Sequence, residues 1–350
     1  MGGITRNLGA QAGIASALLF GAGTPIAKLL LGDVSPWLLA GLLYLGSGLG
    51  LGAYRLVRRL PRMHLQRSEV LPLAGAIIFG GMLGPVLLLL GLSTMPASGA
   101  SLLLNTEGVF TALFAWLVFR EHIGRKIALG MAAIAAGAVA LTLPTSTAVE
   151  FGSPLPALAV LAACLCWSID NNLTRRVALA DATWLAAVKG GVAGPVNLLL
   201  AFLLGASLPP LGSIAAAMTV GLLAYGVSLV LFIVALRHAG TARAGAYYSV
   251  APFFGAIVAL VMGEPLSAPL VIATGLMALG VWLHLTERHA HEHTHDPLAH
   301  EHWHRHDDGH HEHAHPEPIP TGIWHRHEHV HVAIAHSHPH YPDSHHRHKH

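Results

Sequence analysis

Charged side chains are scarce in this sequence. Asp, Glu, Lys and Arg make up 11% of the 350 residues, and 53% of the residues are hydrophobic. Soluble domains carry about 25% charged residues, and a soluble protein with so few could not cover its surface. The composition therefore argues against an ordinary soluble domain and favours a chain embedded in a lipid bilayer.

Cysteines and catalytic motifs are also scarce. Cys164 and Cys166 are the only cysteines, and both lie inside an apolar segment, so there is no disulfide framework. No basic cluster is interleaved with aromatic residues, as a nucleic-acid surface would require. The apolar part of the sequence contains no nucleophile–base constellation, phosphate-binding loop or closed metal-ligand motif. We therefore expect neither an enzyme nor a nucleic-acid partner, and no required cofactor.

Long apolar runs, in contrast, are abundant. A bilayer core of about 30 Å needs about 20 mostly apolar residues per helix, and runs this long exclude the alternating pattern of a membrane β-barrel. The sequence contains ten such stretches, at approximately residues 9–31, 37–57, 70–92, 97–119, 124–143, 154–173, 183–204, 214–236, 242–262 and 267–286. It therefore predicts an all-α integral membrane protein with ten transmembrane helices.

The basic residues predict how these helices are oriented. Fourteen of the 20 Lys and Arg residues lie at the N-terminus or after an even-numbered helix. The connections after odd-numbered helices contain none, and hold the acids Asp33, Glu150 and Glu264. Because basic residues favour the cytoplasmic side, we expect a multi-pass protein of the cytoplasmic membrane with both termini in the cytoplasm.

The two halves of the apolar region show a weak internal repeat. Residues 97–141 align without a gap on residues 240–284, which places Glu121 at the end of the fourth helix on Glu264 at the end of the ninth. Five helices per half is an odd number, so the second half inserts with opposite topology. Inverted repeats of this kind are typical of secondary transporters whose site lies near the middle of the membrane.

The same residues resemble the EamA-type transporters of the drug/metabolite transporter superfamily. The resemblance is carried by residues 105–116 (NTEGVFTALFAW) running to Arg120-Glu121, by Pro252-Phe253-Phe254 running to Gly263-Glu264, and by Trp167. It covers residues 9–286, although Pro252 has Val109 as its first-half counterpart. The resemblance implies two five-helix repeats and export of small solutes, usually by proton exchange or facilitated diffusion. Its members handle amino acids, nucleotide precursors and drugs, and in some branches nickel and cobalt, so it does not name the solute.

We therefore divide the chain into four segments. Residues 1–143 form the first five-helix repeat, 144–153 a linker, 154–286 the second five-helix repeat, and 287–350 a disordered histidine-rich cytoplasmic tail. The expected partners are the lipid bilayer and metal ions, and a homodimer is compatible with the sequence.

A few charged and polar residues inside the apolar stretches are candidates for the transport path. A charge at mid-helix costs at least about 2.5–3.5 kcal/mol, so each should face the bundle interior and have a partner. Structural salt bridges are one interpretation; the other is that at least one carboxylate exchanges a proton or cation, Glu107 first and Asp170 second. The complete candidate set is Glu107, Asp170, Lys28, Lys189, Asn105, Asn171 and Cys166.

Two local patterns accompany these candidates. Cys166 and Asp170 are four residues apart and share a helix face, so with Asn171 they could form a loose cation site. The alternative is that both cysteines are small buried hydrophobic residues. Two glycine pairs, Gly80-Gly81 before Gly84-Pro85 and Gly190-Gly191 before Gly194-Pro195, each predict a kink or hinge, in the third and the seventh helix.

The tail contains 23 of the 27 histidines, many of them at every second residue. Prolines, a glycine and acids interrupt them, so the composition predicts disorder. Neutral imidazole is a preferred ligand of nickel, cobalt, zinc and copper ions. The histidines chosen as metal ligands are His289, His291, His293, His295, His300, His302, His304, His306, His310, His311, His313, His315, His325, His327, His329 and His331.

These features lead to one main functional hypothesis and two alternatives. We expect a secondary transporter that exports divalent transition-metal ions, nickel or cobalt foremost, by proton exchange, with a tail that binds nickel, cobalt or zinc. The first alternative is an exporter of small organic metabolites or drugs with a metal- or pH-responsive tail. The second is a membrane-tethered metal buffer whose helical part transports nothing.

Overall fold

A computed structural model describes residues 2–60, 65–119, 124–142, 154–174, 181–239, 241–286, 290–294, 298–304, 325–331 and 335–339. The chain divides into two units, residues 1–287 and 288–350, and each is described by itself. The predicted linker 144–153 lies outside the described residues, as does Glu121.

The first unit is helical, as predicted. Its described residues include ten helical segments long and apolar enough to cross a membrane, at the positions predicted from the sequence. Six of these spans are single helices: α1 (Gly2–Leu30), α2 (Pro36–Val57), α7 (Arg125–Thr142), α8 (Leu155–Thr174), α9 (Ala182–Leu203) and α14 (Ala268–Thr286). The chain is thus a multi-pass membrane protein.

The other four spans are interrupted. The third consists of α3 (Arg67–Ala76), the π-helical η1 (Ile77–Leu83) and α4 (Gly84–Thr94), and the eighth of α10 (Leu211–Gly221), the π-helical η3 (Leu222–Val227) and α11 (Ser228–Ala239). The fourth span breaks between α5 (Ala97–Leu103) and α6 (Thr106–Phe119), and the ninth between α12 (Thr241–Tyr248) and α13 (Ala251–Val261). Each interruption recurs five spans later, which supports the duplicated architecture.

Proline and glycine set several helix ends. Pro36, Pro85 and Pro252 each lie at the first or second position of a helix, where the missing amide donor costs nothing. Gly205 and Gly263 follow the ends of α9 and α13 with φ of +86° and +101°, a conformation that glycine adopts without strain. Pro36, Gly205 and Gly263 thus lie at the ends of spans, whereas Pro85 and Pro252 begin helices inside the third and ninth spans.

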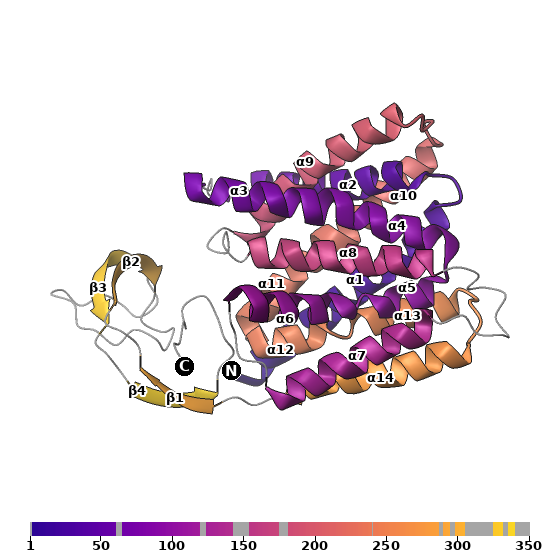
Figure 1. The fold of residues 1–350 in the computed structure, drawn as a ribbon. Coiled ribbons are helices and arrows are strands. Elements are labelled where there is room, and N and C mark those ends of the chain that lie inside the picture. Colours follow the sequence, from indigo (N-terminus) through magenta and orange to yellow (C-terminus); the bar gives the residue numbers. More distant parts are fainter. Residues whose placement is uncertain are drawn as a thin grey trace. The chain divides into compact units, whose positions relative to one another are not determined.

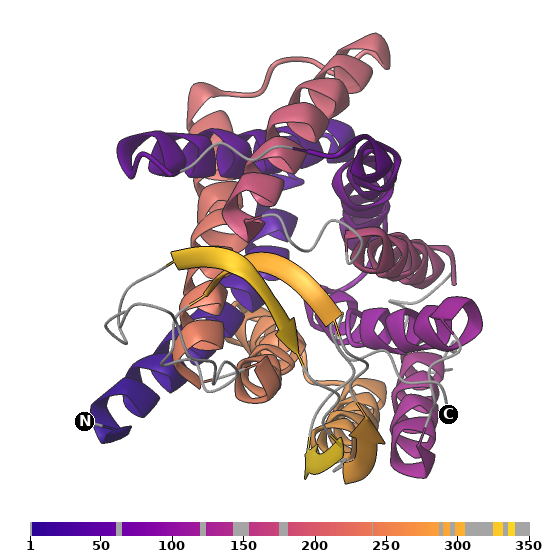
Figure 2. The same cartoon turned by 90° about the vertical axis from the view of Figure 1, so that its left-hand side faces the viewer.

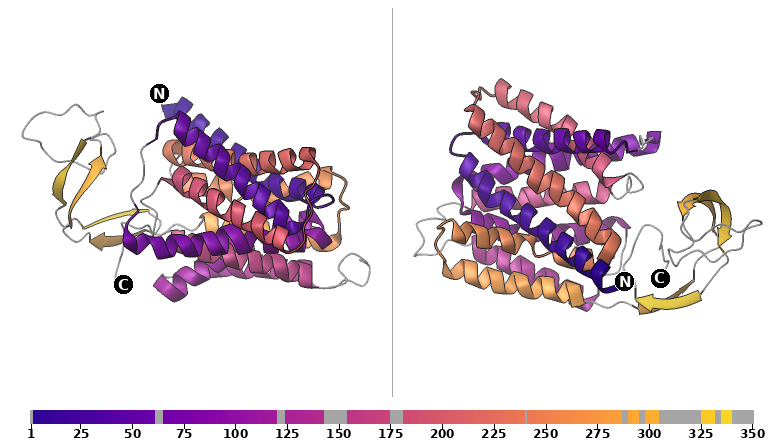
Figure 3. Two further views of the ribbon diagram at one scale, coloured as in Figure 1. Left: turned by 90° about the horizontal axis from the view of Figure 1, so that it is seen from above. Right: turned by 180° about the vertical axis from the view of Figure 1, so that it is seen from behind.

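The helix contacts also recur between the two halves. In Figure 1, α7 and α14 lie side by side, and α2 packs against α9, so the second and seventh spans pair as the fifth and tenth do. The first span contacts the eighth through α1 and α11, and the third contacts the sixth through α4 and α8. Figure 2 looks along many of these helices, and Figure 3 shows α1 running beside α11. Exchanging the halves turns the contact of the first and eighth spans into that of the sixth and third, and it leaves the other two contacts unchanged.

Many apolar side chains face outward from this helical unit. Leu71 and Leu211 are each 81% exposed, and Val261 is 82% exposed. In water such surfaces would be costly, but in a bilayer the lipid chains cover them. The exposed positions therefore agree with a membrane environment.

Glycines allow the second span to approach the seventh and eighth spans closely. A Cβ atom on Gly46 would lie 2.2 Å from the carbonyl oxygen of Met218, and one on Gly221 would lie 2.0 Å from that of Leu43. A Cβ on Gly48 would lie 2.5 Å from the amide nitrogen of Gly191. Small residues at such crossings are the usual means of packing membrane helices.

This packing predicts the effect of one substitution. Gly46→Ala should destabilise the protein by about 1–3 kcal/mol, because the helices must separate to make room for a methyl group. Gly52→Ala is the matched control, since nothing lies within 4 Å of its Cβ position. Thermal unfolding of the detergent-purified variants measures both, and equal midpoints would contradict the close approach.

The described parts of the tail are extended rather than irregular. They form β1 (Ala290–Thr294), β2 (Leu298–His304), β3 (His325–His331) and β4 (Ala335–Pro339), with β1 antiparallel to β4 and β2 antiparallel to β3 (Figure 1). The composition predicted disorder, so these strands are a difference from the sequence analysis. Its physical basis is the alternation of histidine with other residues, a period of two that suits a strand.

Candidate functional site

An ion pair marks the start of the seventh span. Asp181 caps α9 by accepting a hydrogen bond from the Thr183 amide at 2.7 Å, and its other oxygen lies 3.0 Å from a guanidinium nitrogen of Arg55. Arg55 also donates to the Thr183 hydroxyl at 2.7 Å. Burial acts to raise the pKa of Asp181, but hydrogen bonds from Thr183 and Arg55 outweigh it and hold that pKa below its ordinary value of 3.8. This pair joins the end of the second span to the start of the seventh.

A second ion pair joins the sixth span to the seventh. The ammonium of Lys189 is 2.5 Å from one carboxylate oxygen of Asp170, and the hydroxyl of Thr174 donates to the other at 2.9 Å. The side chains of Asp170 and Lys189 are 8% and 16% exposed. The pairing expected for charges inside a membrane is therefore present here.

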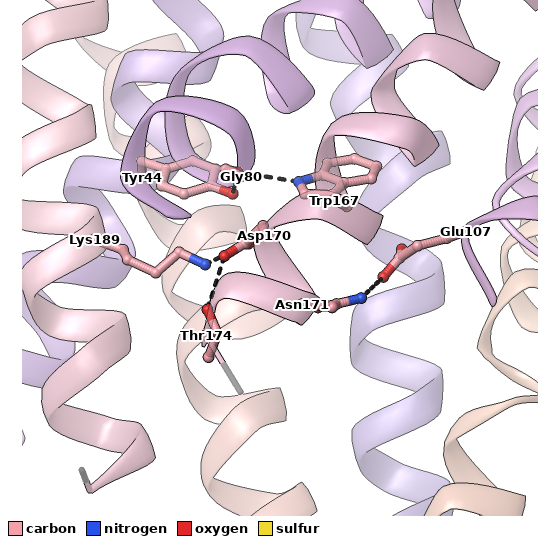
Figure 4. A network of polar contacts seen from close by, with 8 residues as sticks. All are labelled: Tyr44, Gly80, Glu107, Trp167, Asp170, Asn171, Thr174 and Lys189. Carbon is pink, nitrogen blue, oxygen red and sulfur yellow. Dashed lines mark hydrogen bonds and ion pairs between the residues drawn. The ribbon is translucent and has the colours of Figure 1, made fainter. Parts of the chain in front are cut away.

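Glu107 makes a different kind of contact. It lies in the first turn of α6, just after the break in the fourth span, and its carboxylate accepts a hydrogen bond from the side-chain amide of Asn171 at 2.7 Å. Figure 4 shows that Asn171 reaches Glu107 on one side of α8, while Asp170 reaches Lys189 on the other. The two acids thus flank the same turn of α8, one balanced by an ammonium and the other held by an amide.

The π-helical segment η1 of the third span contacts this site through its backbone carbonyl groups. The carbonyl oxygen of Gly80 accepts hydrogen bonds from the hydroxyl of Tyr44 at 2.6 Å and from the indole nitrogen of Trp167 at 3.0 Å (Figure 4). The neighbouring carbonyl of Gly81 accepts one from the buried amide of Asn197 at 3.1 Å. π-Helical segments are frequent at functional sites, and this one offers backbone acceptors to three other spans.

Gly80 is required here by the close approach of Asp170. A Cβ atom at Gly80 would lie 1.9 Å from a carboxylate oxygen of Asp170. The glycine pair was the sequence signal for a distortion of this helix, and the structure has one there. Sequence reasoning missed the part played by Tyr44 and Thr174, because nothing in the local pattern links them to Gly80 or Asp170.

A row of aromatic rings continues from Tyr44. Its ring centroid is 5.7 Å from that of Tyr225, which lies in the π-helical η3 of the eighth span, and Tyr225 is 6.0 Å from Phe20 of α1. Phe20 is 5.3 Å from Tyr248 of α12. The row connects the first, second, eighth and ninth spans, so both π-helical segments contribute to one neighbourhood.

The structure assigns the other predicted path residues to different places. Lys28 donates to the carbonyl oxygen of Met95, beside the start of α5, whose first two amides are capped by the carboxylate of Glu264. Asn105 donates to the carbonyl of Leu102 at 2.9 Å and stabilises the break in the fourth span. Lys28 and Asn105 therefore have local structural contacts.

Cys166 is buried, and Asp170 and Asn171 are engaged by Lys189 and Glu107 rather than by a shared centre. In the part of the chain that the structure describes, no group of three or more His, Cys, Asp or Glu side chains could hold a metal ion. A single carboxylate, that of Glu107, and a neutralised pair, Asp170 with Lys189, therefore lie on opposite sides of α8.

The predicted metal ligands of the tail are only partly described. His291 and His293 lie in β1, and His300, His302 and His304 in β2. His325, His327, His329 and His331 lie in β3. The remaining predicted ligands, His289, His295, His306, His310, His311, His313 and His315, lie outside the described residues.

Known proteins resemble this chain over most of its length. The family model of the EamA-like transporter family matches residues 7–143 and 154–286. An uncharacterized transporter of Methanothermobacter thermautotrophicus is 29% identical over 294 residues, which cover 77% of this chain and 84% of that protein. One crystal structure of a protein superposes with a TM-score of 0.58 at 21% identity, covering 79% of this chain and 95% of that chain, so it shows similarity of fold alone.

Proposed function

The chain belongs to the EamA-like transporter family, and on that premise we propose that it is a secondary transporter that exports divalent transition-metal cations, nickel or cobalt foremost, across the cytoplasmic membrane in exchange for protons. The observation that carries this proposal is the combination of one amide-held carboxylate within a membrane span with 23 histidines in the tail of the same chain.

The site supports a role for Glu107 as the exchanging group. The charge of Asp170 is balanced by Lys189, so this pair can remain inside the bundle without binding anything else. Glu107 is held by the neutral amide of Asn171, which does not itself cancel the charge of the carboxylate, so a proton or a cation can bind there to do so. A carboxylate that alternates between a proton and a cation couples the movement of one to the movement of the other.

The tail supports a metal ion as the cargo. Imidazole is the side chain that nickel, cobalt and zinc ions share as a ligand, and the tail presents it at high density. The distribution of basic residues favours a cytoplasmic tail, where it would collect ions from the compartment that an exporter empties. The weak ligand set within the bundle suits release, because a carrier that binds its cargo too tightly cannot discharge it.

One observation favours a second candidate, the export of a small polar organic solute. The row formed by Phe20, Tyr44, Tyr225 and Tyr248 is linked to the ion pair through Gly80, whose carbonyl accepts a hydrogen bond from Tyr44 and which packs against Asp170. Aromatic rings and a pair of opposite charges are suited to a solute that has an apolar body and charged ends. In that case the tail would regulate the transporter rather than supply its cargo.

Flux measurements on two forms of the protein test both candidates. Full-length protein and protein truncated after residue 288 are reconstituted into liposomes, and uptake of nickel, cobalt and zinc is followed with and without a pH gradient. We expect the truncated protein to transport nickel or cobalt, and the gradient to accelerate it. Absent metal flux in both forms would contradict metal export, metal flux that ignores the pH gradient would contradict proton exchange, and competition by an organic solute would favour the second candidate.

A further inference from the structure

The two spans that break into separate helices, the fourth and the ninth, meet at one end of the bundle only. They cross the membrane in opposite directions, so α5 and α13 lie at one end, called here the Glu264 end, and α6 and α12 lie at the other. α5 packs against α13 (Figure 1). In the part of the chain that the structure describes, α6 and α12 make at most a marginal contact, and pack instead on α8 and on α1 with α11.

The internal repeat makes this arrangement asymmetric. Residues 97–103 of α5 align with residues 240–246, most of which lie in α12, and residues 251–261 of α13 align with residues 108–118 of α6. The counterpart of the α5–α13 contact is therefore an α6–α12 contact. Transporters built from inverted repeats change access by moving one repeat against the other. The α5–α13 contact is thus the part of this fold that we expect to open when α6 and α12 close.

One side chain ties the end of α13 to the start of α5. Glu264 follows α13, and its two carboxylate oxygens accept hydrogen bonds from the amides of Ala97 at 2.6 Å and Ser98 at 2.8 Å. Hydrogen bonds to a carboxylate are stronger than those between neutral groups. Glu264 is partly exposed, so water can take over these hydrogen bonds when the two helices separate.

Below this tie the two helices approach closely. A Cβ atom on Gly255 of α13 would lie 2.6 Å from the hydroxyl oxygen of Ser101 in α5 and 2.8 Å from the carbonyl oxygen of Gly21 in α1. Ser101 is 1% exposed, and its hydroxyl has no hydrogen-bond partner among the described residues. Burying a hydroxyl without a partner costs free energy. Closure therefore has a cost at Ser101, which the hydrogen bonds of Glu264 help to offset.

We propose that Glu264 is a latch: its carboxylate holds α13 on α5, keeps the Glu264 end closed, and releases the two amides when that end opens during transport. Release leaves no buried charge, because the carboxylate and the amides all become accessible to water. The inference rests on the chain being a transporter, which its family shows, and not on the identity of the cargo.

Sided labelling of a buried cysteine tests the latch. Ser101→Cys is introduced into the full-length protein, and a membrane-impermeant maleimide is applied to intact cells and to inverted membrane vesicles. Gly212→Cys, at the start of α10 with nothing within 4 Å of its Cβ position, identifies the side from which the Glu264 end is reached. Glu264→Gln keeps the shape but can accept from only one amide. It should accelerate labelling of Ser101→Cys from that side by about tenfold, as expected for the loss of one charge-assisted hydrogen bond.

A second variant removes the other partner of the same contact. Ala97→Pro deletes one of the two amide donors at the first position of α5, where a helix tolerates proline. It should also accelerate labelling. Combined with Glu264→Gln it should accelerate labelling much less than the product of the two single effects, because both variants remove one interaction.

Two controls separate a latch from general loosening. Asp33→Asn alters another acid at the Glu264 end, which accepts a hydrogen bond from the Ser213 hydroxyl at 3.1 Å, and should leave labelling unchanged. The native Cys164 and Cys166 are buried and should stay unlabelled in Glu264→Gln. Equal acceleration by Asp33→Asn, multiplicative effects of Ala97→Pro and Glu264→Gln, or reaction of the native cysteines at the same rate would overturn the inference.

A reversible crosslink tests whether this contact opens during transport. The Cβ positions of Ser101 and Gly255 lie 2.9 Å apart, and a disulfide spans about 3.5–4.5 Å between Cβ atoms, so a small separation lets Ser101→Cys and Gly255→Cys join. Oxidation of the double variant should stop nickel or cobalt flux, and a reductant should restore it. Oxidised protein that transports as fast as reduced protein would overturn the latch. Absent metal flux in the unaltered protein would refute metal export instead, and the labelling, which requires no cargo, would still decide the latch.

Discussion

Glu107→Gln is expected to abolish the acceleration of transport by a pH gradient and to slow metal flux by about 10- to 100-fold. Glutamine keeps the acceptor that the Asn171 amide uses, so the contact between α6 and α8 survives. What it removes is the negative charge that a proton or a cation must balance. Charge-assisted hydrogen bonds contribute roughly 1.5–3 kcal/mol, and about 1.4 kcal/mol corresponds to a tenfold change.

Proteoliposome flux across a range of pH gradients measures this effect. Glu69→Gln is the matched control, because it makes the same chemical change in the first turn of α3, where Glu69 caps the amide of Gln66. The control should transport like the unaltered protein. A Glu107→Gln protein that still responds to the pH gradient would show that another group carries the proton.

Asp170→Asn is expected to lower the stability of the protein by about 3–5 kcal/mol, because it leaves the ammonium of Lys189 in a largely buried position without its partner carboxylate. Asparagine has the same shape and keeps the acceptor for Thr174, so the loss reports the charge rather than the packing. Adding Lys189→Met should restore most of the stability, since it removes the uncompensated charge.

Reaction of a thiol-specific dye during heating measures this stability. Cys164 and Cys166 are both buried and free, so they become reactive as the bundle opens. Asp181→Asn is the matched control at the other ion pair, where the acid is 33% exposed and a smaller loss is expected. If the double variant is no more stable than Asp170→Asn, the Asp170–Lys189 pair does not hold the bundle by charge compensation.

The sequence alone predicted that the chain is a membrane protein and how many times it crosses the bilayer. Both follow from local properties, because a helix in lipid needs about 20 apolar residues in succession and each stretch satisfies its own backbone hydrogen bonds. The distortion near Gly80-Gly81 was also predicted, since glycine pairs followed by proline weaken a helix locally. The same pattern at Gly190-Gly191 and Pro195 leaves α9 one uninterrupted helix, so the local pattern alone does not decide where a span is interrupted. These features depend on residues close together in the chain.

The partners of the charged residues were decided by the tertiary structure. The sequence contained Glu107, Asp170, Lys28 and Lys189 as two acids and two bases, and it left open how they would pair. Asp170 pairs with Lys189, whereas Glu107 meets Asn171 and Lys28 meets the carbonyl of Met95. The choice depends on which helices cross, and the crossings depend on close contacts such as Gly46 with Met218.

The tail shows the same division between local pattern and long-range arrangement. The alternation of histidines was visible in the sequence and indicated imidazole-rich chemistry. The register that sets His293 opposite His336 was not, because strand pairing is a relation between residues far apart in the chain. Sequence alone therefore determined which environment each segment suits and which chemistry it carries. Only the folded chain decided which side chains meet, because contacts between distant segments depend on how whole helices and strands pack together.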